Sequence, residues 1–298
     1  MTESLRVLMT DLIDYAGLFP PAALPMKASV HNFDLYRRGE HAWMLNRFVV
    51  PVARLDEFLC AFEQLPGSSD IPVPWKLSAI VGSNAKSDIA TIVDFNQRAS
   101  SRNSGVIVEA LELKAADPGA ICQLAELLPR GFESYFEIPC SNMTEACIRA
   151  IAEVGSRAKL RTGGDNAQMF PSFGDVADFL VACASSSISF KASAGLHHAI
   201  KGVHRYTYEP ESASGIMHGF LNIFVAAAFA RQGMKAPDIE TVLTEPGQAF
   251  GFDHTGVRWN ECHIPNEELA SARHSFCLSF GSCSFNEPID DLRVLGLL

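Results

Sequence analysis

Residues 105–139 read GVIVEALELKAADPGAICQLAELLPRGFESYFEIP and contain the unit on which the fold depends. The runs Gly105–Leu113 and Ser134–Pro139 are rich in β-branched and aromatic residues, which is typical of strands. Between them, Pro118–Leu128 has the apolar spacing of a helix, and Asp117 precedes it as a helix cap would. A strand followed by a helix and a second strand is one βα unit of a parallel sheet.

Strand-like runs recur about every 25–30 residues on both sides of this unit, which is the length of a βα repeat. The other runs are FVVPV (Phe48–Val52), LSAIVG (Leu77–Gly82), AKLRTGG (Ala158–Gly164) and ISFKASAG (Ile188–Gly195). The other helical patterns are Arg54–Leu65, Asp88–Ala99, Met143–Val154 and Phe173–Ala184. Six such strands predict an α/β protein with a parallel sheet. The first βα turn, VPVARLDEF, has no glycine, and no GxxxxGK[ST] occurs, so a (β/α)8 TIM-like barrel is favoured over a doubly wound sheet.

The barrel is predicted to form a single domain over residues 1–298, with an N-terminal helix and a Pro-rich arm within residues 1–45. The arm, Phe19–Met26, either covers one end of the barrel or fills its bottom. The closing third is irregular, and the two remaining strands are expected there. Gly215–Gln232 predicts a helix, the run 249–259 (AFGFDHTGVRW) a β-hairpin, and Ser275–Phe285 a strand or a helix end.

Composition excludes several classes of protein. The chain has 24 Lys and Arg against 34 Asp and Glu, a net charge of −10, which does not suit binding to nucleic acid or to an anionic membrane. The longest apolar run, Phe220–Ala230, is too short to span a bilayer, and the N-terminus lacks the basic start of a signal peptide. Eight cysteines without a CxxC pattern predict reduced thiols and a cytoplasmic location. The expected partner is a small molecule, and a homo-oligomer stays possible.

Alternation along four successive strands predicts a charged barrel interior. Outward side chains pack beneath helices and are apolar, so the charged side chains between them point into the lumen. Ile107, Leu111 and Leu113 are assigned to the outer face, and the parity of Glu109 would also place it there. The side chains predicted to point inward are Glu112, Glu137, Lys159, Arg161, Lys191 and Ser193.

These inward charges suggest chemistry because barrel enzymes react at the carboxyl ends of their strands. Lys159 and Lys191 are expected side by side, where each ammonium would lower the pKa of the other. A neutral lysine attacks a carbonyl to form an imine, and Glu112 or Glu137 would move protons.

An anionic substrate is expected because the region around the lysines is basic. Residues 157–205 contain six Lys or Arg and three Asp. Arg161 would bind a carboxylate or phosphate. Gly163 and Gly164 follow it, and they are expected to let backbone amides approach the anion, to form a turn that needs positive φ, or to do both.

AKLRTGG, a helix and ISFKASAG resemble the fifth and sixth strands of deoxyribose-phosphate aldolase and related class I aldolases. The resemblance covers about 40 residues and implies a barrel lyase. It implies that Lys191 forms the Schiff base and that Lys159 tunes it. It also implies that Glu112 or Glu137 replaces the family's proton-relay aspartate. No cofactor is implied.

Two further functions stay open. Histidines follow the last of these strands, and His197 or His198 would position a substrate hydroxyl. Alternatively, Glu112, Glu137, His197 and His218 would hold a divalent metal in an isomerase, aldolase or hydrolase of the same fold. The third hypothesis is a barrel that binds an anion or a sugar without turnover.

Overall fold

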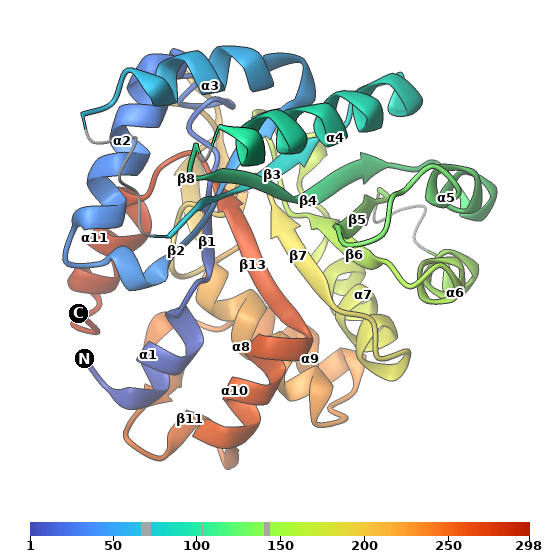
Figure 1. Cartoon of the computed structure of the whole chain (residues 1–298). Helices are drawn as coiled ribbons and strands as arrows, with labels where there is room; N and C mark the ends of the chain where they lie inside the picture. The colour runs from blue at the N-terminus through green and yellow to red at the C-terminus, as the bar shows by residue number, and fades with distance from the viewer. Residues whose placement is uncertain (67–72, 103, 140–143) are drawn as a thin grey trace.

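The computed structural model describes residues 1–66, 73–102, 104–139 and 144–298, and its centre is a closed barrel of eight parallel strands (Figure 1). The predicted (β/α)8 barrel is therefore confirmed. Strand β13 closes the circle because it pairs with both β7 and β1. The strands are β1 (Ile13–Tyr15), β2 (Leu45–Pro51), β3 (Trp75–Ile80), β4 (Val106–Lys114), β5 (Glu133–Glu137), β6 (Arg157–Arg161), β7 (Phe190–Ser193) and β13 (Cys277–Ser282).

Helices surround the barrel, and all of them except the last, α11, lie between successive barrel strands in the sequence (Figure 1). They are α2 (Met26–Arg38), α3 (Leu55–Glu63), α4 (Ala85–Ser101), α5 (Pro118–Ala125), α6 (Glu145–Glu153), α7 (Phe173–Ser185), α8 (Phe220–Arg231) and α11 (Asn286–Val294). The chain adds α1 (Glu3–Met9), α9 (Ala236–Thr244), α10 (Asn266–Ser275) and the short 3₁₀ helices η1 (Ala42–Met44), η2 (Val52–Arg54), η5 (Ala167–Met169) and η6 (Gly247–Ala249). None of the helices in the described part of the chain is long and apolar enough to cross a bilayer.

The long segment between β7 and β13 carries two antiparallel elements. One is a hairpin of β8 (Gly202–Arg205) and β9 (Ser214–Met217). The other is a sheet of β10 (Phe250–Phe252), β11 (Gly256–Trp259) and β12 (Cys262–Pro265). The hairpin predicted for residues 249–259 is thus confirmed as β10 and β11. The helix predicted from Gly215 begins only at Phe220, because β9 occupies the residues before it.

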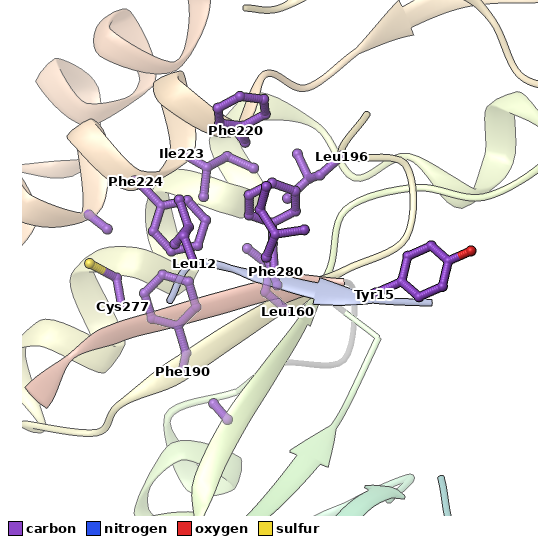
Figure 2. Packing of buried hydrophobic residues seen from close by; sticks show 14 of the residues in the cluster. Leu12, Tyr15, Leu160, Phe190, Leu196, Phe220, Ile223, Phe224, Cys277 and Phe280 are labelled. Atoms are coloured by element: carbon purple, nitrogen blue, oxygen red, sulfur yellow. The ribbon is translucent and has the colours of Figure 1, made fainter. Parts of the chain in front are cut away.

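Helix α8 is buried on every side, which explains its continuous apolar sequence. Its inner face packs against the barrel, where Phe220 stacks on Phe280 of β13 with ring centroids 5.1 Å apart. Phe224 stacks on Phe190 of β7, and Figure 2 shows these rings together around the strands. Its outer face is covered by α7, α9 and α10. The apolar run is therefore a core helix.

Side-chain caps set the starts of several helices. Asp117 accepts a hydrogen bond from the Ala120 amide, as the sequence suggests, and Ser172 and Asp175 form a reciprocal capping box at the start of α7. Asn84 caps α4, which therefore begins at Ala85, three residues before the predicted start. The side chain of Asp88 instead accepts from the Gly82 amide.

The two strands that the sequence left unplaced come from opposite ends of the chain. Of the two structures predicted for Ser275–Phe285, a strand or a helix end, the strand is present as β13. The expectation that both remaining strands lie in the closing third is wrong, because the other strand is β1, in the segment taken as a helix and an arm. Three residues are too short for a visible periodicity, so β1 escapes a pattern search. Counted from β1, the AKLRTGG and ISFKASAG runs occupy the sixth and seventh barrel strands, one later than the resemblance placed them.

A β-bulge in β4 corrects the predicted orientation of its first half. Leu77 of β3 pairs with Val108, but the next residue, Ser78, pairs with Ala110, so Glu109 is the extra residue. The alternation shifts by one at this point. Glu109 pairs with Arg47 on the lumen side. Ile107 lies two residues before Glu109 and faces the same side as Glu109, whereas Leu111 and Leu113, after the bulge, face outward.

Candidate active site

A cavity of about 340 Å³ opens at the carboxyl ends of the barrel strands. The arm after β1 covers it, since Phe19, Pro20 and Pro21 are among the lining residues, so the arm caps this end of the barrel. The other lining residues are Ala16, Val49, Ile80, Glu112, Glu137, Lys159, Arg161, Gly164, Asp165, Met169, Lys191, Ser193, Ala194, Gly195, His197, Gly281 and Cys283.

The cavity floor is a continuous row of ion pairs that we call the upper charged layer. It consists of the lining residues Lys191, Glu112, Lys159, Glu137 and Arg161 and of Asp14, which is fully buried and does not itself line the cavity. Lys191 Nζ lies 2.6 Å from both Asp14 Oδ2 and Glu112 Oε1. Lys159 Nζ lies 2.8 Å from Glu112 Oε2 and 2.6 Å from Glu137 Oε2. Arg161 ends the row, with Nη1 3.4 Å from Glu137 Oε1.

Strand register brings these side chains together. Lys159 of β6 is paired directly with Lys191 of β7 and, on its other side, with Glu137 of β5. Hydroxyl groups fix the carboxylates from the remaining strands: Ser78 donates to Glu112 Oε1 at 2.6 Å, and Ser279 donates to Asp14 Oδ2 at 2.8 Å. The predicted inward orientation of the two lysines and two glutamates therefore agrees with the structure.

The electrostatics differ from the sequence prediction. Burial alone would lower the pKa of Lys191, but Asp14 and Glu112 raise it well above its usual value. Glu112 and Glu137 likewise raise the pKa of Lys159 against the effect of burial. The expected mutual lowering of the two lysine pKa values is thus wrong, because a carboxylate lies between the ammonium groups.

The net charge of the lumen also differs from the excess of basic residues that the sequence shows around the lysines. Lys159, Lys191 and Arg161 face three carboxylates, so the upper charged layer is balanced. The third carboxylate, Asp14, was missed because it lies on the three-residue strand β1. Its one sequence signal is its position between Ile13 and Tyr15, which point outward. Ser78 and Ser279 were also missed, although each alternates with apolar neighbours.

The predicted anion-binding residues lie at the rim, with one exception. Arg161, Gly164 and Ser193 line the cavity, and the Arg161 side chain is one-third exposed. Gly163 is not among the lining residues, although its carbonyl accepts from Arg161 Nε at 3.1 Å. Neither glycine has a positive φ, so the predicted turn is wrong. A Cβ at Gly163 would lie 2.4 Å from the Phe170 ring, so close packing requires the glycine.

The two histidines after β7 have different surroundings. His197 lines the cavity, and its Nδ1 lies 3.7 Å from Cys283 Sγ and 3.3 Å from Glu287 Oε2. Burial would lower the pKa of His197, but the hydrogen bonds to Cys283 and Glu287 raise it to about 9. His197 is therefore a cation at neutral pH.

His198 has a structural position. It turns to α11, where Nδ1 lies 3.1 Å from Asp291 Oδ2, and it is not among the residues that line the cavity. The structure thus brings only one of the two histidines to the site.

The residues of the alternative metal site do not converge. Within the described residues, no group of three or more His, Cys, Asp or Glu side chains is placed to hold a metal ion. Ammonium groups lie against the carboxylates of Glu112 and Glu137. His218 Nε2 instead lies 2.9 Å from the Pro171 carbonyl oxygen, and its ring packs edge-on against Phe173.

Comparisons with known proteins add little. No family model and no curated protein matches the chain. Among solved structures, a dihydropteroate synthase from Xanthomonas albilineans, in complex with indole-2-carboxylic acid and 6-chloroguanine, is 8% identical, with a TM-score of 0.26 over 97% of this chain and 93% of that chain. A likeness at this level carries no argument, so the function must be argued from the side chains of the site.

Proposed function

We propose that the protein is a carbonyl enzyme of the carbon–carbon lyase type, in which Lys191 forms an imine with a small anionic substrate. The observation that carries this proposal is the position of Lys191 Nζ, which lies 2.6 Å from two carboxylates at the floor of the cavity. Imine formation needs a nucleophilic amine and an acid. When the Lys191 ammonium transfers a proton to a neighbouring carboxylate, the amine becomes the nucleophile and the protonated carboxylate becomes the acid.

The proton transfers follow from these contacts. Lys191 passes one proton to Glu112 or Asp14, and its free amine then adds to the substrate carbonyl. The resulting carboxylic acid protonates the carbinolamine hydroxyl, which leaves as water and yields the imine. The protonated imine then accepts the electron pair of the bond between the carbons α and β to it as that bond breaks. The hydroxyl on the departing β carbon gives its proton to the regenerated carboxylate, and that carbon leaves as a carbonyl.

The raised pKa of Lys191 is compatible with this sequence. That pKa describes loss of the proton to bulk water, which would leave the lumen with an extra negative charge. Transfer within the pair converts an ammonium and a carboxylate into an amine and a carboxylic acid. The net charge of the lumen does not change, and the hydrogen bond along which the proton moves is already formed.

Two cations at the rim support an anionic substrate. The partly exposed guanidinium of Arg161 and the imidazolium of His197 both line the cavity, above the paired lysines. A carboxylate or phosphate bound between them would direct the carbonyl towards the floor.

Borohydride trapping tests the proposal. The protein is incubated with short aldehydes, 2-oxo acids and sugar phosphates, reduced and weighed intact, and the adduct is mapped. We expect an adduct on Lys191 that falls at least ~100-fold in Lys191→Met. Lys86→Met, on the surface helix α4, is the matched control and should be trapped like the wild type.

An adduct on Lys159 in the wild type would overturn the role of Lys191. Tight binding of a ligand that yields neither adduct nor turnover would favour the non-catalytic barrel, for which the complete pairing of the upper charged layer is the supporting observation.

A further inference from the structure

The cavity has two chemically different halves. The charged half is formed by β4 to β7, which carry Glu112, Glu137, Lys159, Arg161 and Lys191. The opposite half, which we call the apolar wall, is formed by the arm after β1 and by the ends of β2 and β3. The residues of the apolar wall are Ala16, Phe19, Pro20, Pro21, Val49 and Ile80.

The apolar wall offers no side-chain hydrogen bonds. None of its six side chains has a polar atom, whereas the charged half places five ionisable groups in the same small space. A substrate with hydroxyl groups along its length would lose water from them against this wall without gaining partners. An alkyl or aryl group would instead remove apolar surface from water on both sides of the contact.

Resting on the function proposed above, we propose that the substrate is a 4-hydroxy-2-oxo acid whose chain beyond this one hydroxyl is alkyl or aryl, in preference to a sugar phosphate or another polyhydroxylated compound. The C3–C4 bond then breaks, and C4 leaves as the carbonyl carbon of an apolar aldehyde or ketone. Its carboxylate binds at Arg161 and His197, and its carbonyl faces Lys191. Its alkyl or aryl group packs against Phe19, Val49 and the other residues of the apolar wall. A volume of about 340 Å³ suits a compound of this size.

Binding of saturated carboxylates tests the substrate class without any imine chemistry. Calorimetry with propanoate, butanoate, pentanoate and hexanoate measures the effect of each methylene group, and glycerate serves as the hydroxylated analogue. We expect the affinity to rise about threefold to fourfold per methylene, the equivalent of about 0.8 kcal/mol. An affinity that is flat along the series, or glycerate binding more tightly than butanoate, would overturn the inference.

Two variants locate the effect on the apolar wall. Val49→Thr adds a hydroxyl at almost constant volume, and Phe19→Ala removes a ring from the arm that lies outside the strands. Each should weaken hexanoate at least ~threefold more than propanoate. Val203→Thr, on the exposed hairpin strand β8, is the matched control and should change neither affinity. Equal losses for both ligands in both variants would contradict the assignment.

The two proposals fail separately. If affinity rises with chain length but borohydride yields no adduct from any 2-oxo acid, the apolar substrate class is supported and imine formation by Lys191 is rejected. If polar and apolar carbonyl compounds are trapped equally well on Lys191 and affinity does not follow chain length, imine formation by Lys191 is supported and the apolar substrate class is rejected.

Discussion

Two layers of charge fill the same barrel, and the buried cations that bridge their carboxylates differ. Lysines bridge the upper layer, which ends on the half-buried Arg161, and arginines bridge the lower layer, with Lys76 at its exposed edge. The lower charged layer, near the amino ends of the strands, consists of Arg47, Glu109, Glu133 and Arg157. Arg47 Nε lies 2.8 Å from Glu109 and its Nη2 2.8 Å from Glu133, and Arg157 also pairs with Glu133. The upper charged layer has lysines at the corresponding positions between its carboxylates.

The difference in cation type separates a structural network from a reactive one. Arginine keeps its proton at any pH that proteins tolerate, whereas lysine can pass a proton to a neighbouring carboxylate. Tyr135 lies between the layers: its hydroxyl donates to Glu133 at 2.9 Å, and Lys191 Nζ lies 5.4 Å from its ring centroid. Of the two, only the upper charged layer lines the cavity at the carboxyl ends of the strands, whereas Arg47, Glu133 and Arg157 of the lower layer line a separate pocket at the amino ends.

Exchanging lysine for arginine in the upper layer should have the largest effect on imine formation, and exchanging arginine for lysine in the lower layer should have little effect. Lys191→Arg keeps the positive charge between Asp14 and Glu112 but removes the titratable amine, so we expect borohydride trapping to fall at least ~100-fold. Arg47→Lys makes the reverse change in the lower layer and should leave trapping within about twofold of the wild type. Trapping mass spectrometry measures both, and a trapped Lys191→Arg would contradict the assignment.

Arg273 should be the most important single side chain for stability below the lower layer. It is buried and donates to four backbone carbonyls, which belong to Leu8, Thr10, Cys277 and Leu278. Arg273→Met leaves these acceptors unpaired, and we expect a loss of ~4 kcal/mol in the free energy of unfolding. Urea unfolding measures it, and Arg273→Lys should retain part of the stability. A loss below ~1 kcal/mol would show that water replaces the guanidinium.

Glu112→Gln tests the coupling of the two lysines. The variant leaves each lysine with one carboxylate, and we expect a loss of ~3 kcal/mol near pH 7. Lys159 and Lys191 lower the pKa of Glu112 against the effect of burial. Its stabilisation is therefore complete above the unfolded pKa of about 4.3 and is lost as the pH falls from that value through the much lower folded pKa.

The stabilities of wild type and Glu112→Gln should therefore converge on acidification. Urea unfolding at pH 7 and at about pH 2.5 measures this, because the stabilisation is lost only below the unfolded pKa, and the exposed Glu57 supplies the matched control, Glu57→Gln. A difference between wild type and Glu112→Gln that is constant with pH would refute the charge-based explanation.

The smallest expected effect concerns His197 at the rim. Its pKa is raised to about 9 in the folded protein, so its stabilisation is complete below the unfolded pKa of about 6.5 and is lost as the pH rises through about 9. His197→Gln should cost on the order of 2 kcal/mol at pH 6 and much less at pH 10. Urea unfolding at the two pH values checks this, and an equal loss at both would mean that packing alone explains the effect.

Local sequence patterns predicted a large part of this fold. Six strands and the helices after them could be located because each run is long enough to show its period. Alternation also assigned Glu112, Glu137, Lys159, Arg161 and Lys191 to one interior, since a strand fixes the side of each residue relative to its neighbours. Where β4 has a bulge, the same rule failed for Ile107 and Glu109.

The sequence by itself therefore determined the fold class and the charged strands that line the lumen. Tertiary structure decided which charges meet. Asp14 is 177 positions from Lys191, yet barrel closure puts β1 beside β13 and two strands from β7. That contact reverses the predicted direction of the lysine pKa shift, because the pKa of a buried ammonium depends on the charges within a few ångströms and not on its neighbours in sequence.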